Sequence, residues 1–196
     1  PRGPRPEARG PRTRYDPRVF VIYEVVLYLV FIVALPWFLL LGVLRGKYLT
    51  NFSARLGFYR TRPSAHELWI HAVSVGEVIA ARPVMMAIER MRPGTSMVIT
   101  TTTVTGQAQA RRLYPGAVVT YFPFDFSFSV NRFLDHHAPS VFATMETEIW
   151  PNVTRLARRR GLRLVLANGR ISDRSYPRYR ALRFLIGRVL RQYHRI

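Results

Sequence analysis

Glu77 stands where a carboxylate could do acid–base chemistry. It follows an apolar run and the short segment Ser74–Gly76. Facing a cleft, it could act as a general base that removes a proton from a hydroxyl group. The alternative is a structural role, because an acidic residue in the first turn of a helix stabilises the helix dipole, which in turn lowers its pKa. Gly76 is expected to allow a tight turn before that helix.

Glu146 and Glu148 lie two residues apart, directly after a second apolar run. Two carboxylates this close are costly to bury unless a cation or a substrate pairs with them. The helix dipole would account for one of them more easily than for both. A nearby arginine or a bound ligand is therefore expected, and Arg170 could pair with either glutamate or bind a ligand phosphate.

Two polar segments could hold a sugar or a phosphate. The hydroxyl groups of Thr103 and Thr105, and the backbone N–H groups up to Gly106, stand at the start of an expected helix. That arrangement suits a phosphate or a sugar hydroxyl, and the alternative is an ordinary threonine N-cap. Asn168 and Arg170 belong to a second segment, which could equally be a solvated polar loop.

From Glu67 onward, short β-rich runs alternate with longer helical stretches, the pattern of a parallel sheet covered by helices. We expect strands at 68–73, 97–102, 117–122, 140–145 and 162–167. We expect helices at 77–91, 105–113, 129–137, 150–160 and 178–190. Ligands of such sheets bind outside the carboxyl ends of the strands, and all the candidate residues above follow expected strands. The sequence therefore predicts an α/β, Rossmann-like domain with its site at that edge.

Several kinds of chemistry lose support because their motifs are absent from the sequence. No expected strand is followed by G-x-G-x-x-G, and neither a P-loop nor an H-E-x-x-H segment occurs. The chain has no cysteine, which excludes disulfides, a cysteine-based zinc site and a thiol nucleophile. Of the histidines, His71 at a strand end could contact a ligand, but a hydrogen-bonded place in the core is favoured for it. The surface is expected for His66, His136, His137 and His194.

The N-terminal part of the chain reads as a basic arm, an apolar run and a basic connector. Residues 1–18 hold six arginines against two acidic residues, among proline and glycine, and are expected to be disordered. Residues 19–44 carry one charge, Glu24. As a helix they would extend ~39 Å, enough to cross a hydrocarbon layer of ~30 Å. We interpret them as an uncleaved transmembrane anchor rather than a buried core helix, followed by a juxtamembrane connector at 45–66.

The chain of 196 residues has a formal net charge of +19, which implies nucleic acid, a phosphorylated ligand or an anionic membrane surface as partner. The excess is concentrated in residues 151–196, with thirteen arginines against one aspartate. These arginines are not interleaved with stacking aromatic residues, and a bilayer anchor is an odd companion for a nucleic-acid binder, so no nucleic-acid partner is expected. The helix at 178–190 is either a cationic amphipathic surface helix or an ordinary domain helix.

Four segments, in this order, resemble the N-terminal half of the 3-deoxy-D-manno-octulosonic acid (Kdo) transferase family. They are WIHAVSVGE at 69–77, TTTTVTG at 100–106, ETEIWPN at 146–152 and NGRIS at 168–172. An apolar anchor precedes them, as in that family. The resemblance runs from about Val19 to the last residue.

The resemblance implies an inverting glycosyltransferase of the GT-B fold, held by a single-pass anchor at the cytoplasmic face of the bacterial inner membrane. Such an enzyme transfers Kdo from CMP-Kdo to the lipid A precursor, and needs no metal and no cofactor. The resemblance also implies Glu77 as the general base and Glu146 as a second catalytic carboxylate, a transition-state stabiliser. The domain at 67–196 would bind the acceptor, for which the candidates are Ser74, Gly76, Thr103, Thr105, Gly106, Glu148, Asn168 and Arg170.

In that family the CMP-sugar binds to a second Rossmann-like, C-terminal domain, for which the chain has no room before Ile196. We expect half of an enzyme, which binds the acceptor weakly and transfers nothing alone, with CMP-Kdo contacting only the missing domain. The alternative is a membrane-anchored protein that binds an anionic lipid or polysaccharide precursor without catalysis.

Overall fold

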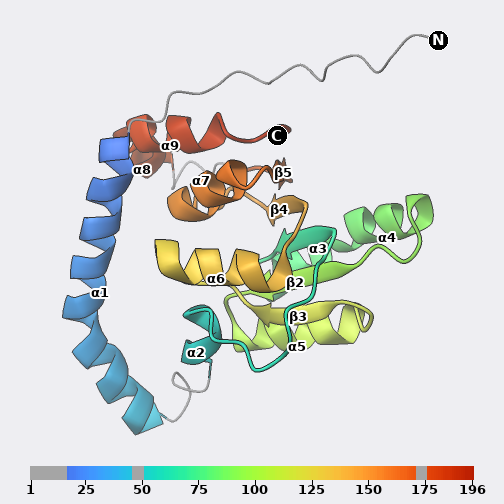
Figure 1. The fold of residues 1–196 in the computed structure, drawn as a ribbon, viewed down its shortest axis with the longest axis horizontal. Helices are drawn as coiled ribbons and strands as arrows, with labels where there is room; N and C mark the ends of the chain where they lie inside the picture. The colour runs from blue at the N-terminus through green and yellow to red at the C-terminus, as the bar shows by residue number, and fades with distance from the viewer. Residues whose placement is uncertain (1–16, 46–50, 171–175) are drawn as a thin grey trace.

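A sheet of five parallel strands forms the centre of the computed structural model, which describes residues 17–45, 51–170 and 176–196 (Figure 1). Its order is β3-β2-β1-β4-β5, which fits a Rossmann-like fold. The parallel sheet expected from the sequence is confirmed, and each strand lies within two residues of its expected bounds. The strands are β1 Leu68–His71, β2 Met97–Thr101, β3 Val118–Tyr121, β4 Val141–Met145 and β5 Arg163–Ala167.

Helices cover both faces of the sheet. Side chains alternate along a strand, so β1 directs Trp69 to one face and its neighbour Ile70 to the other. The core on the Trp69 face is closed by α6 Ser127–His137, α7 Pro151–Arg159 and α9 Arg183–Leu190. The opposite face is covered by α3 Val75–Ala80, α4 Arg82–Met91 and α5 Val104–Leu113. The strands β1 and β2 are consequently buried along their whole length.

Two of the expected helices are each broken in two. The expected helix 77–91 consists of α3 and α4, with the break at Ala81. Pro83 explains this break, because proline lacks the N–H that a continuing helix needs and is accepted only in the first turn of a new one. The expected helix 178–190 consists of α8 Tyr176–Ala181 and α9. Because α9 buries Val189 in the core beside α7, it is an ordinary helix of the domain.

Residues 51–66, between the apolar run and the sheet, pack against the domain. They include the short helix α2 Phe52–Arg55, and the His66 N–H donates to the His137 carbonyl at 2.9 Å. His66 and His137 are both buried by this packing, so the expectation that they lie on the surface is wrong. His71 lies in the core, as expected, with Nδ1 3.1 Å from the Thr100 carbonyl oxygen.

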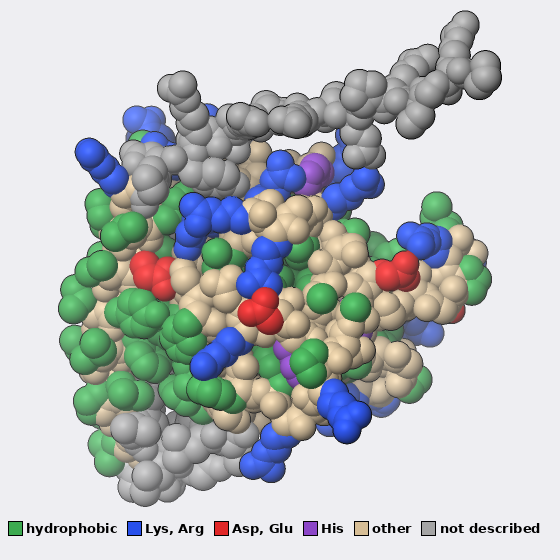
Figure 2. All heavy atoms as spheres, in the orientation of Figure 1, with side chains coloured by type: hydrophobic (Ala, Val, Ile, Leu, Met, Phe, Trp, Pro, Cys, Tyr) green, Lys and Arg blue, Asp and Glu red, His purple; other side chains and the backbone are tan. Residues whose placement is uncertain are grey.

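The apolar N-terminal run forms one long helix, α1 Pro17–Arg45, beside the domain (Figure 1). Within the described residues, its segment Arg18–Trp37 is the one that could cross a membrane by length and composition. On the side of α1 that faces the domain, Tyr28 stacks on Phe126 with ring centres 4.8 Å apart. The opposite side is exposed and apolar, and Figure 2 shows it as a hydrophobic flank of the molecule. It includes Ile22, Val26, Leu29, Val30, Ile32, Val33, Trp37 and Leu40.

The single charge of the apolar run, Glu24, connects α1 to the domain. Its carboxylate accepts hydrogen bonds from the Ser127 backbone N–H at 2.8 Å and from the Asn152 side-chain amide at 2.7 Å. It also lies 4.0 Å from the Arg155 guanidinium. Ser127 and Asn152 stand at the N-terminal ends of α6 and α7, where the helix dipole favours a carboxylate. Glu24 therefore fixes α1 across the N-terminal ends of two domain helices.

Candidate active site

The two loops that carry the candidate carboxylates lie side by side at the carboxyl edge of the sheet. The strands β1 and β4 are neighbours, with His71 paired to Thr144. The chain leaves β1 toward the face covered by α3 and leaves β4 toward the face covered by α7. Such a switch point is where open parallel sheets bind their ligands. The structure thus brings Glu77, Glu146 and Glu148 within electrostatic reach of one another.

Glu77 is held by the loop that precedes it. Ser74 is the N-cap of α3, and its hydroxyl accepts a hydrogen bond from the Glu77 N–H. In return, the Glu77 carboxylate accepts from the Ser74 hydroxyl at 3.2 Å and from the Val73 N–H at 2.8 Å. This is a variant of the capping box in which the glutamate reaches the N–H of the residue before the cap, so the structural role considered for Glu77 is present. Burial nevertheless raises the pKa of Glu77, against the lowering effect of these hydrogen bonds, which makes it a better base.

Glu146 has a left-handed backbone conformation with φ 59°, which costs a non-glycine residue roughly 1 to 2 kcal/mol. Its N–H donates to the Ala167 carbonyl at 2.9 Å, and its carboxylate forms an ion pair with Arg170. The Thr147 hydroxyl donates to the Arg170 carbonyl at 2.6 Å. These contacts join the end of β4 to the loop after β5. Arg170 is therefore the cation expected beside the two glutamates, and it pairs with Glu146.

Glu148 forms no ion pair within the described part of the chain. Burial, and then the charges of Glu77 and Glu146, raise the pKa of Glu148 to about 7. Near neutral pH it is partly protonated and can donate a hydrogen bond as well as accept one.

Across residues 17–45, 51–170 and 176–196, no group of three or more histidine or acidic side chains is placed to hold a metal ion.

The three candidate residues at 103–106 lie at the start of α5. Thr103 is its N-cap, and the Thr103 hydroxyl accepts from the Gly106 N–H at 3.0 Å, so the ordinary N-cap considered for it is present. Thr105 is exposed. A Cβ on Gly106 would lie 2.7 Å from Thr103 Oγ1 and 3.4 Å from the Val73 carbonyl oxygen. Gly106 therefore allows α5 to approach the loop after β1.

The remaining candidates differ in what their backbones require. Gly76 lies inside α3 without a positive φ, and a Cβ there would meet only Ser74 Oγ at 3.8 Å. The expected tight turn at Gly76 is therefore wrong, because the Ser74 cap starts the helix. Asn168 ends β5 with φ 56°, a conformation that asparagine adopts more readily than most residues. This turn leads into Arg170 beside the carboxylates.

Arg55 of α2 reaches the same edge of the sheet and was not expected from the sequence. Its guanidinium donates to the Thr102 carbonyl, just beyond the end of β2, and lies 4.8 Å from the centre of the Tyr121 ring. In the sequence, Arg55 is one of several basic residues in the stretch 45–66, and no local pattern distinguishes it. Only the packing of that stretch on the domain reveals its position.

Residues 50–196 match the family model of 3-deoxy-D-manno-octulosonic-acid transferase (kdotransferase). The chain belongs to the Kdo transferase family. The resemblance inferred from the four sequence segments is thereby confirmed.

Three curated relatives, each named 3-deoxy-D-manno-octulosonic acid transferase, illustrate the similarity. The Haemophilus influenzae protein is 38% identical over 143 residues, which cover 71% of this chain and 34% of that protein. The Bordetella pertussis protein is 37% identical over 127 residues, which cover 62% of this chain and 29% of that protein. The Chlamydia pneumoniae protein is 33% identical over 173 residues, which cover 86% of this chain and 40% of that protein. The chain thus spans about a third of the length of these Kdo transferases.

The Kdo transferase model covers every candidate residue of the site, from Arg55 to Arg170. It begins at residue 50, just before α2, 17 residues before the start of the domain expected at residue 67. The helix α1 ends at Arg45, before the matched region.

Proposed function

We propose that the chain is the acceptor-binding half of a Kdo transferase, an inverting GT-B glycosyltransferase that transfers Kdo from CMP-Kdo to the lipid A precursor in lipopolysaccharide synthesis. The observation that carries this proposal is the group formed by Glu77, Glu146 and Glu148 at the switch point of the sheet, in a chain of this family. CMP-Kdo binds to a second, C-terminal domain, so the chain alone binds the acceptor without transfer. The reaction uses no metal and no cofactor.

Glu77 acts as the general base in this mechanism. Its carboxylate removes the proton from the acceptor hydroxyl while that oxygen bonds to the anomeric carbon of Kdo. The bond from that carbon to the CMP phosphate oxygen breaks, CMP leaves with the electron pair, and the proton stays on Glu77. Attack opposite to the leaving group inverts the anomeric configuration. The hydrogen bonds from Val73 and Ser74 orient the carboxylate and leave further acceptor positions for the substrate.

Glu146 stabilises the positive charge that develops on the sugar ring in the transition state. The ion pair with Arg170 and the left-handed backbone hold its carboxylate in place beforehand. Polar groups around the carboxylates of Glu77 and Glu146 hold the acceptor sugar. The glycines among the contacts leave the sugar room to approach. These acceptor contacts are Ser74, Gly76, Thr103, Thr105, Gly106, Glu148, Asn168 and Arg170.

The helix α1 attaches the chain to the cytoplasmic face of the bacterial inner membrane. In its docked position, Glu24 keeps the Asn152 amide and the Arg155 guanidinium against α1. If α1 crossed the bilayer in this position, the charges of Glu24 and Arg155 would enter the hydrocarbon core, where each costs roughly 2.5 to 3.5 kcal/mol. The ring contacts of α1 with the domain reach as far as Phe31. Residues 32–45, which follow it in α1, would extend only ~21 Å as a helix, short of the ~30 Å hydrocarbon layer. We therefore propose that α1 lies along the membrane surface with its apolar side in the lipid, rather than crossing as a single-pass span.

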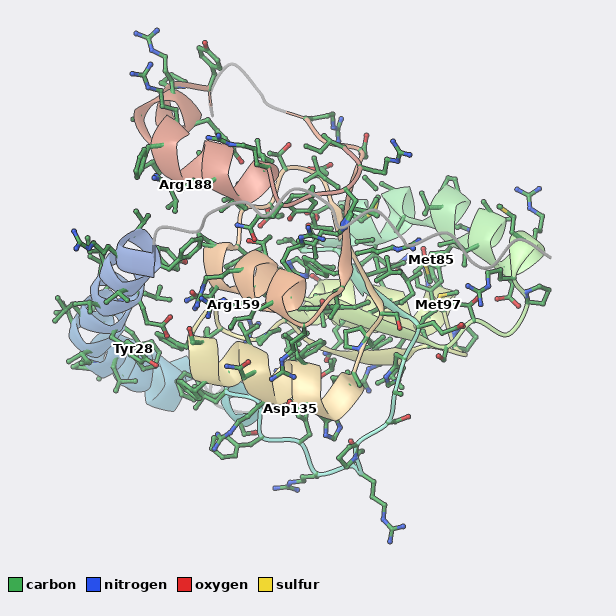
Figure 3. The ribbon with its side chains drawn as sticks, turned by 45° about the horizontal axis from the view of Figure 1, so that its top comes forward. Tyr28, Met85, Met97, Asp135, Arg159 and Arg188 are labelled. Carbon is green, nitrogen blue, oxygen red and sulfur yellow. The ribbon has the colours of Figure 1, made fainter. Side chains whose placement is uncertain are left out.

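Anionic lipid headgroups favour this placement. The helices α8 and α9 lie next to the N-terminal end of α1 in Figure 1, and Figure 2 shows Lys and Arg side chains above the hydrophobic flank. Such basic residues beside an apolar helix face strengthen binding to anionic lipid. Tyr28 and Arg159, labelled in Figure 3, line a cavity of about 440 Å³ between α1 and the helices α6 and α7. Glu24 of α1 contacts the N-terminal ends of α6 and α7, which lie at the carboxyl edge of the sheet. A membrane surface along α1 is therefore next to that edge, where the lipid acceptor reacts.

A transfer assay tests this function. The chain is joined to a C-terminal Kdo transferase domain and incubated with CMP-Kdo and lipid A precursor, and the released CMP is measured. We expect CMP release only when both the second domain and the acceptor are present. Acceptor binding without CMP release from the joined protein would favour the alternative, a membrane-anchored protein that binds an anionic lipid or polysaccharide precursor.

A further inference from the structure

Arg55 is held at the carboxyl edge of the sheet by the packing of α2. The Phe124 N–H donates to the Arg55 carbonyl at 2.8 Å, which fixes the backbone. The guanidinium lies over the ring of Tyr121 at 4.8 Å and near that of Phe124 at 5.8 Å, while one N–H donates to the Thr102 carbonyl. Two aromatic faces and one carbonyl therefore set the plane of the guanidinium.

The charge of Arg55 has no counterion in the described part of the chain. The ion pairs between described residues involve Arg92, Arg155, Arg160 and Arg170, and leave Arg55 out. Burial lowers the pKa of Arg55, because desolvation disfavours the charged form. A guanidinium has five N–H donors, and the described residues accept one of them from Arg55. A partly desolvated cation with free donors is stabilised when an anion binds to it.

Arg55 and the candidate base Glu77 are joined through two backbone residues. Arg55 donates to the carbonyl of Thr102, and Thr102 bonds to the Val73 carbonyl through both its N–H at 3.2 Å and its hydroxyl at 3.1 Å. The Val73 N–H in turn donates to the Glu77 carboxylate. Arg55 thus flanks Glu77 on the β2 side of the site, whereas the Glu146–Arg170 ion pair flanks it on the β4 side.

The residues around Arg55 also connect it to α1. Phe52, three residues before Arg55, packs on Phe31 of α1 with ring centres 6.0 Å apart, and on Phe124 at 5.4 Å. The cation therefore lies where the membrane-associated helix meets the site.

We propose that Arg55 binds a phosphate monoester carried by the acceptor sugar, and so places the acceptor hydroxyl at Glu77. This inference rests on the proposed function for its substrate. Its chemistry rests on the aromatic-stacked guanidinium, which forms no ion pair with the described residues. A fixed, planar guanidinium fits two phosphate oxygens at once, which a neutral sugar hydroxyl does not match. Arg55 is then a specificity-determining residue that distinguishes phosphorylated from unphosphorylated acceptors.

Calorimetric titration of this chain in detergent tests the proposal. The probes are a glucosamine disaccharide that carries one phosphate monoester, the same disaccharide without phosphate, and inorganic phosphate. We expect the wild-type chain to bind the phosphorylated disaccharide about tenfold more tightly than the unphosphorylated one, because a charge-assisted bidentate contact contributes roughly that much. Arg55→Gln removes this preference. The matched control Arg60→Gln, an exposed arginine of the same segment, keeps it.

Arg55→Lys provides a second variant that retains the cation without the planar fork, so it remains informative if Arg55→Gln does not fold. We expect it to lose most of the preference. A preference that persists in both variants, or that is absent from the wild-type chain, overturns the proposal. Equal affinity for inorganic phosphate and the phosphorylated disaccharide overturns the assignment to the acceptor. A preference that depends on Arg55 in a chain whose joined protein releases no CMP would refute the proposed function and leave the phosphate site intact.

Discussion

The backbone N–H of Val73 donates a 2.8 Å hydrogen bond to the carboxylate of Glu77, four residues further along the chain. This contact fixes the candidate base relative to the end of β1 before any substrate arrives. Because Val73 also bonds to Thr102 at the end of β2, two adjacent strand ends and the base form one connected unit. The structural and catalytic roles considered for Glu77 are therefore compatible, since the capping box positions the carboxylate that would take the proton.

Gly106→Ala should destabilise the domain, because the new Cβ would lie 2.7 Å from the Thr103 oxygen that caps α5. Loss of that cap costs about 1 kcal/mol. Gly76→Ala is the matched control, since its Cβ meets nothing closer than 3.8 Å and alanine favours a helix interior by roughly 0.5 to 1 kcal/mol. Denaturant unfolding of both variants measures the difference. Equal stability of the two variants would contradict the close contact of α5 with the loop after β1.

Glu148→Gln should stabilise the domain at high pH and not at low pH. The pKa of Glu148 is raised to about 7 in the folded chain, above its unfolded value of ~4.5. The folded state therefore holds more protons than the unfolded state between these values, so the wild-type stability falls as the pH rises through this window. The amide cannot ionise, which removes this loss. Melting temperatures at pH 4 and pH 8 provide the comparison.

The control for Glu148 is Glu89→Gln, which changes an exposed glutamate in the same way. We expect its melting temperature to follow that of the wild-type chain at both pH values. If Glu148→Gln also follows the wild type at both pH values, Glu148 is not buried beside the other two carboxylates as described.

The position of α1 in a membrane can be measured with single cysteines, because the chain has none of its own. Ile22 and Val33 lie on the same exposed side of α1, 63% and 80% exposed, and three turns apart. Spin labels at Ile22→Cys and Val33→Cys should show similar depths in vesicles with anionic lipid if the helix lies along the surface. A helix that crosses the bilayer would separate the two depths by ~16 Å. Val104→Cys, exposed on α5, is the water-accessible control.

Much of the fold could be predicted, because the secondary structure that the local sequence pattern favours is also the one that the tertiary structure contains. The five strands are short apolar runs, and a parallel sheet must place their following loops at one edge, which is why the candidate residues were found there. The break at Ala81 was missed, although Pro83 marks it, because the apolar periodicity continues across it.

Other features depend on contacts between distant parts of the chain. Glu24 is separated from Asn152 by 128 residues, and Arg55 from Thr102 by 47. In the sequence, the first is a charge within an apolar run and the second an arginine in a basic stretch. Neither local pattern contains the partner, so the docking of α1 and the position of the Arg55 guanidinium were visible only in three dimensions. The expected arm at 1–18 is described only at Pro17 and Arg18, and residues 46–50 and 171–175 of other expected segments lie outside the described residues.

The most direct test of the account is the rate of CMP release by the joined protein with Glu77→Gln. Glutamine can still accept the Val73 hydrogen bond and complete the capping box, so the fold and acceptor binding should persist. It cannot take a proton, so the rate should fall by about 10² to 10⁴-fold. Glu67→Gln, at the opposite end of β1 and half-exposed, should leave the rate unchanged. A Glu77→Gln variant that releases CMP at the wild-type rate would show that Glu77 is not the base.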